Sequence, residues 1–100
     1  MCCDHVMNIR RMQLDVDKAM LRPDLLELAE VIEKVPGIEG ANITVTEIDL
    51  ETVGLQITVE GDSIDARRLI REIEKAGAEV HSIDELVVGR RTVEHVARIR

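Results

Sequence analysis

The stretch from Ala41 to Glu60 constrains the fold most, because it predicts two long strands joined by a tight turn. Its second half alternates apolar and polar residues strictly, which is the two-residue period of a half-buried strand. In its first half the apolar parity slips near Thr46 and Glu47, as expected for a β-bulge. We expect the turn at Gly54, and hence an antiparallel strand pair.

The segments on either side of this pair supply two helices and two more strands. Residues 9–17 alternate like a half-buried strand, and residues 78–89 predict a further strand whose apolar parity also shifts. Residues 23–35, with Pro23 expected at the first helical position, and residues 65–76 place their apolar side chains on one helical face. The order is that of a ferredoxin-like βαββαβ fold, an α+β class with a four-stranded antiparallel sheet and two helices on one face.

The chain divides into an N-terminal extension (1–8), the ferredoxin-like domain (9–91) and a short C-terminal tail (92–100) that carries a helical pattern. In this topology the first strand of the hairpin and the strand at 78–89 form the two edges of the sheet. Exposed strand edges must be blunted or paired, and both of these break parity and lack a covering element. We therefore expect a homo-oligomer assembled through its edge strands.

Composition and charge exclude several classes of partner. The net charge is −7, divided into −10 for residues 1–89 and +3 for residues 90–100, and the chain has no Phe, Tyr or Trp. An acidic body without aromatic residues is a poor nucleic-acid binder. No run of 18 apolar residues predicts a membrane span, and the adjacent Cys2 and Cys3 offer no disulfide framework, so we expect a cytoplasmic protein.

Four segments together resemble a known family: VDKAMLRPDLLELA, NITVTEIDLET, LQITVEG and VHSIDELVVG. They are similar to the archaeal family called Domain of Unknown Function 211, from about Ile9 to about Arg91. The resemblance implies a ferredoxin-like fold, an archaeal source, a cytosolic setting and self-assembly. It implies no reaction, and it does not extend to residues 1–8 or to the tail.

The sheet face opposite the helices is expected to be polar and to carry Asp15, Glu60 and, depending on the bulge, Glu47 or Asp49. Converging carboxylates raise one another's proton affinity and favour a hard cation such as calcium or magnesium. Solvated surface charges account for the same residues without any ligand, because acidic side chains are common on the surface of so acidic a chain.

A second candidate group is His81, Ser82 and Asp84, followed by Glu85. An imidazole oriented by a carboxylate could bind a small ligand or serve a metal-dependent hydrolase or lyase. Positions three apart in a strand point to opposite faces unless the strand bends, so the alternative is an edge histidine at a subunit contact and an aspartate in a turn.

The N-terminal extension holds a third group, Cys2, Cys3 and His5, which are soft ligand types for copper(I) or zinc. Adjacent cysteines lack the spacing that lets both sulfurs face one ion, so we expect no specific site there. Three hypotheses remain open: an oligomeric binding or regulatory module that takes a divalent cation or small ligand, a hydrolase or lyase, and a purely structural assembly protein. No cofactor is required by any motif.

Overall fold

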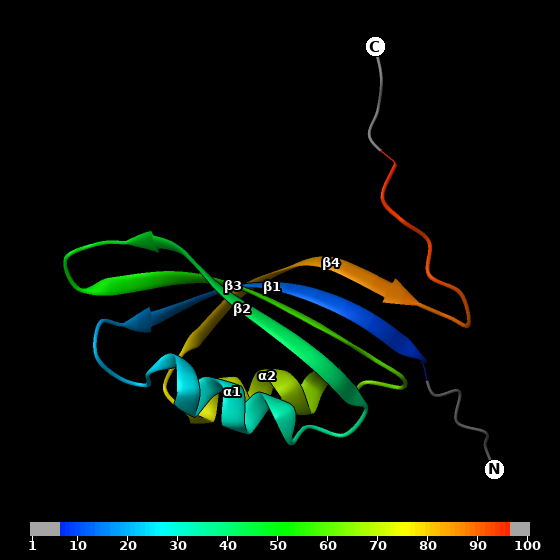
Figure 1. Ribbon diagram of the computed structural model, residues 1–100, viewed down its shortest axis with the longest axis horizontal. Helices are drawn as coiled ribbons and strands as arrows, with labels where there is room; N and C mark the ends of the chain where they lie inside the picture. Colours follow the sequence, from blue (N-terminus) through cyan, green and yellow to red (C-terminus); the bar gives the residue numbers. More distant parts are fainter. Residues whose placement is uncertain (1–6, 97–100) are drawn as a thin grey trace.

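The chain folds in the predicted order of strand, helix, strand, strand, helix, strand. Figure 1 shows the computed structural model, which describes residues 7–96. The elements are β1 (Ile9–Ala19), α1 (Leu25–Glu33), β2 (Ile38–Ile48), β3 (Thr52–Gly61), α2 (Ala66–Lys75) and β4 (Glu79–Val88).

The four strands form one antiparallel sheet in the order β2-β3-β1-β4. The central strands are therefore β1 and β3, and the edge strands are β2 and β4. Both helices lie on one face of the sheet, α1 next to β2 and α2 next to β4, and the other face is open (Figure 1). The ferredoxin-like α+β fold is thus confirmed.

The hydrophobic core lies between the central strands and the two helices. Its largest members have no solvent exposure, and all are aliphatic because the chain contains no aromatic residue. The alternation in β1 and β3 and the helical spacing in α1 and α2 place these side chains in one layer. They are Met12, Leu14, Val16, Leu28, Ile32, Leu55, Ile57, Val59, Leu69 and Ile73.

Both edge strands contain the irregularities that their parity predicted. Val45 and Glu47 pair with consecutive residues of β3, so Thr46 is the extra residue of a bulge. Because of this bulge, Ile48 lies opposite Val53, two residues from the partner of Val45 on β3. The side chains of Val45 and Ile48 therefore lie on the same face of the sheet. The pairing of β4 with β1 shifts register at three places.

The first helix begins two residues later than the sequence predicted. Pro23 lies before the helix, and Asp24 is the residue that caps it. The Asp24 carboxylate accepts a hydrogen bond from the Glu27 amide at 2.8 Å. The Glu27 carboxylate in turn accepts from the Asp24 amide at 2.9 Å. This reciprocal capping box satisfies two backbone donors and fixes the start of α1 at Leu25.

Two further details differ from the sequence pattern. The hairpin turn is at Asp49–Glu51, where the Asp49 amide donates to the Thr52 carbonyl at 2.8 Å, and Gly54 lies inside β3. The tail, whose pattern allowed a short helix that is marginal without packing partners, is irregular over residues 92–96, and its apolar side chains Val93 and Val96 are exposed. Residues 97–100 lie outside the described part.

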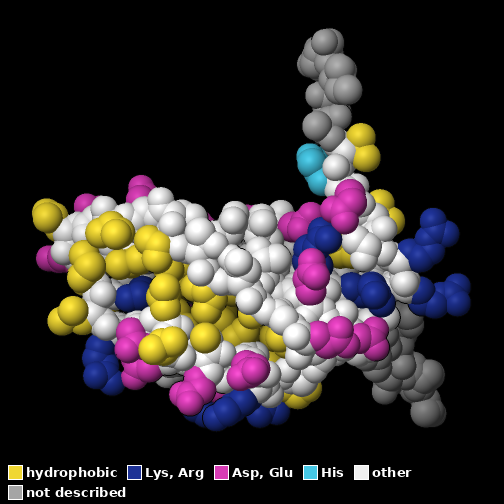
Figure 2. Space-filling view, in the orientation of Figure 1, with side chains coloured by type: hydrophobic (Ala, Val, Ile, Leu, Met, Phe, Trp, Pro, Cys, Tyr) yellow, Lys and Arg dark blue, Asp and Glu magenta, His cyan; other side chains and the backbone are white. Residues whose placement is uncertain are grey.

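Hydrophobic side chains are exposed where the strands extend past the helices. Nine- and ten-residue helices span roughly 14–15 Å, whereas strands of 10 or 11 residues span roughly 33–36 Å. Figure 2 shows apolar side chains gathered at one end of the molecule. Exposed apolar residues on the hairpin, on the connector that follows β1 and on α1 are Met20, Leu21, Leu26, Val45, Ile48 and Leu50.

Candidate functional site

The open sheet face is organised around Arg11, whose side chain is only 19% exposed. Its guanidinium donates to Glu60 at 3.0 Å and to both carboxylate oxygens of Glu94 at 3.2 and 3.1 Å, and it lies 3.5 Å from Glu85. The pKa of the Glu94 carboxyl is lowered by its hydrogen bonds to Arg11. Arg11 therefore ties the tail to the open face and neutralises part of its acidic charge.

The predicted carboxylate group does not converge. Glu60 lies opposite Arg11, four positions from Asp15 along β1, which is about 13 Å. Glu47 lies opposite the β3 residue that pairs with Asp17, and Asp49 accepts a hydrogen bond from the amide that follows it in the turn. Among residues 7–96, no group of three or more His, Cys, Asp or Glu side chains could hold a metal ion.

The structure pairs His81 with a residue that the sequence analysis did not single out. The His81 Nε2 atom lies 2.7 Å from the Asp17 carboxylate, and this contact raises the pKa of His81 above its ordinary value. Ser82 donates to Asp84 at 2.8 Å, and Glu85 lies by Arg11. His81 and Glu85 therefore each contact a residue of β1, and Asp84 contacts Ser82 within β4, whereas the hypothesis paired His81 with Asp84 or Glu85.

The third predicted group, Cys2, Cys3 and His5, lies outside the described residues.

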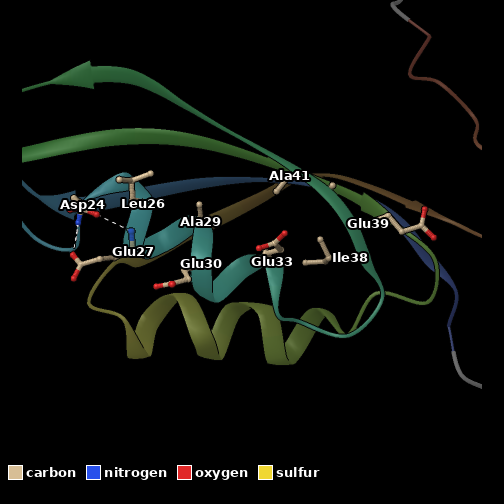
Figure 3. Close-up of a pocket in the computed structure, with 10 residues that line it drawn as sticks. Asp24, Leu26, Glu27, Ala29, Glu30, Glu33, Ile38, Glu39 and Ala41 are labelled. Carbon is tan, nitrogen blue, oxygen red and sulfur yellow. Dashed lines mark hydrogen bonds between the residues drawn. The ribbon is translucent and has the colours of Figure 1, made fainter.

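A groove runs along the β2 edge between α1 and the start of β2; we call it the α1–β2 groove. Its volume is about 850 Å³. In Figure 3, Ala29 and Glu33 of α1 lie along it with Ile38 and Ala41 of β2. Five carboxylates line it, which makes it the most acidic cavity of those described: Asp24, Glu27, Glu30, Glu33 and Glu39.

A second groove, of about 620 Å³, runs along the opposite edge between α2 and β4. Its lining is mainly aliphatic, and among residues 7–96 the only basic residue that lines it is Arg67 at the start of α2. The apolar side chains that line it are Met7, Ile9, Met12, Pro36, Ile64, Ala66, Ile70, Ile83 and Leu86. The two edges of the sheet therefore present cavities of different chemical character.

These features define a small ferredoxin-like α+β domain with a polar open face and two unpaired sheet edges. The chain belongs to the DUF211 family, described as an uncharacterized ArCR, whose family model matches residues 10–100. It is also similar to the uncharacterized protein MJ0319 of Methanocaldococcus jannaschii, with 40% identity over 88 residues. These residues make up 88% of this chain and 90% of that protein. The family match extends to the end of the tail, beyond Arg91, where the resemblance was expected to end.

Neither helix in the described range 7–96 is long and apolar enough to cross a membrane.

Proposed function

We propose that this chain is a non-catalytic binding or regulatory module that acts as a homo-oligomer, with copies joined through β2 and β4. The carrying observation is that both edges of the sheet are long and carry exposed apolar side chains. On β2, Ile48 is 69% exposed, and on β4, Ile83 and Leu86 are 46% and 47% exposed. Long apolar edges promote pairing with another chain.

The directions of the strands support continuation of the sheet from copy to copy. Neighbours in the order β2-β3-β1-β4 are all antiparallel, so β2 and β4 run in opposite directions. An added copy therefore pairs its β4 with β2 in the antiparallel sense and keeps its helices on the same face. Such pairing would bury the exposed aliphatic residues of both edges.

A hydrolase or lyase has less support. A base must be oriented toward a reacting group, and a nucleophile or metal must lie beside it. His81 is half-exposed on the sheet surface with its ring nitrogen held by Asp17, and Asp84 is engaged by Ser82. The described residues thus offer a binding surface on the open sheet face, and the grooves along the β2 and β4 edges would add to it at the subunit junctions.

The test replaces one exposed apolar residue on each edge by lysine, as Val45→Lys on β2 and Leu86→Lys on β4. Leu50→Lys is the matched control, because Leu50 is exposed in the hairpin turn and lies on neither edge strand. Light scattering after size exclusion should give a multiple of the 11.2 kDa subunit mass for the wild type and the control. Each edge variant should move toward 11.2 kDa.

A wild-type mass of 11.2 kDa at every protein concentration would overturn the proposal. So would edge variants that keep the wild-type mass while circular dichroism shows them folded.

A further inference from the structure

The α1–β2 groove carries negative charge that the described part of the chain leaves unmatched. Glu30 and Glu33 of α1 and Glu39 of β2 form no ion pair within residues 7–96. Between them lie the aliphatic side chains of Ala29 and Ile38. Such a groove suits a partner with a cationic head group on an apolar stem, as in arginine.

The chain carries such a partner directly after β4. Arg90 and Arg91, the arginine pair, follow Gly89 at the end of this edge strand. Both are exposed, and neither forms an ion pair within the described residues. They begin the basic tail, whose net charge is +3 over residues 90–100, against −10 for residues 1–89.

We infer that the α1–β2 groove binds the arginine pair of a second copy of this chain. The inference rests on the proposed edge pairing and specifies that β4 of one copy pairs with β2 of the next. When β4 of one copy pairs antiparallel with β2 of the next, the end of β4 at Val88 lies beside the start of β2 at Ile38. The residues that follow Val88 then emerge at the acidic groove.

The charges of the two helices favour the same direction. Helix α1, at the β2 edge, contains three glutamates and no basic residue, whereas α2, at the β4 edge, contains four basic residues and two glutamates. In head-to-tail pairing the acidic α1 of one copy adjoins the basic α2 of the next. Pairing of two like edges would instead bring like charges together, which is unfavourable.

The arginine pair of the same copy is poorly placed to fill the groove. It follows β4, which is three strand spacings from β2, or about 14 Å. The tail beyond it is tied to the open face by the contact of Glu94 with Arg11. Glu30 and Glu33 lie on α1, on the other side of the sheet, so a second copy is the better source of the cation.

The experiment exchanges the charges of the two surfaces. One full-length variant carries Glu30→Arg and Glu33→Arg, and the other carries Arg90→Glu and Arg91→Glu. Each alone should self-associate about tenfold more weakly than wild type in sedimentation experiments at low salt, because screening weakens ion pairs between exposed charges. Mixed in equal amounts, the two variants should assemble more tightly than either does alone, since each groove then meets a tail of opposite sign.

The control carries Asp15→Arg and Glu51→Arg, two exposed positions outside the groove and on neither edge strand nor helix, and should assemble like wild type. If the edge variants are monomeric but both charge variants assemble like wild type, the groove assignment is overturned and edge pairing stands. If mixing fails to restore assembly that each charge variant has lost, the assignment is also overturned. A wild type that is monomeric throughout overturns edge pairing and the groove assignment together.

Discussion

Replacing Leu14 by alanine should be among the most destabilising single changes in this chain. Leu14 is fully buried on the central strand β1, opposite Ile57 of β3 and Ile83 of β4. A buried Leu→Ala change costs about 2–5 kcal/mol through lost transfer free energy and the cavity left behind. The β-branched isoleucines on both sides are stiff at χ1 and relax little, so we expect about 3–4 kcal/mol.

That loss is large beside the roughly 5–15 kcal/mol that stabilises a typical domain. For a domain of this size it should lower the Tm by about 12–30 °C. Urea unfolding followed by circular dichroism measures it, with the free energy extrapolated linearly to zero denaturant. The matched control is Leu50→Ala in the hairpin turn, outside both edge strands, whose side chain is 92% exposed and should contribute less than about 0.5 kcal/mol.

Equal effects at Leu14 and Leu50, or a Leu14→Ala loss below about 1 kcal/mol, would refute the assignment of the core to the central strands. The two variants must be compared at the same protein concentration, because self-association stabilises the folded state by mass action.

Two further changes probe the open face and the loops. NMR titration should give His81 a pKa above its ordinary value of 6.5, and Asp17→Asn should return the pKa toward that value. Because the pKa is raised in the folded state, the contact stabilises the protein below about pH 6.5, and this stabilisation is lost as the pH rises through the folded-state pKa. An unshifted His81 would contradict the contact. Gly61→Ala should destabilise strongly in urea unfolding because its Cβ would overlap the Gly37 carbonyl oxygen. Gly40→Ala, whose Cβ meets no atom within 4 Å, is its control.

Local pattern was enough to predict the fold. The alternation in β1 and β3 and the helical spacing around Leu28 and Leu69 each depend on a single segment, and the segments agree with one another. The parity slip at Thr46 also located the β2 bulge. An extra residue in one strand moves the following side chains to the other face of the sheet, so the alternation of apolar residues must shift at the same place. The turn was misplaced since a glycine inside a strand gives the same local signal as a glycine in a turn.

The candidate site was harder to predict because it depends on register between strands far apart in sequence. His81 and Asp17 lie on β4 and β1 and are 64 positions apart in the sequence. The register between these two strands shifts at three places. Sequence pattern predicts the face on which a carboxylate lies, but not its distance from another carboxylate along the sheet. Glu60 was expected beside Asp15 and instead lies opposite Arg11, where the ion pair forms.

Because the helices are shorter than the strands, they cover only part of the sheet, and the protection of its backbone amides from solvent should differ along the strands. Backbone amides near Leu14 and Ile57, covered by both helices, should exchange with solvent only when the whole domain opens. Amides of β2 near Ile48 have exposed side chains and no helix beneath them, so brief local fraying should suffice there. Within one copy, β2 therefore joins a slowly exchanging half beneath the helices to a rapidly exchanging half at the hairpin, which can move while the core stays closed.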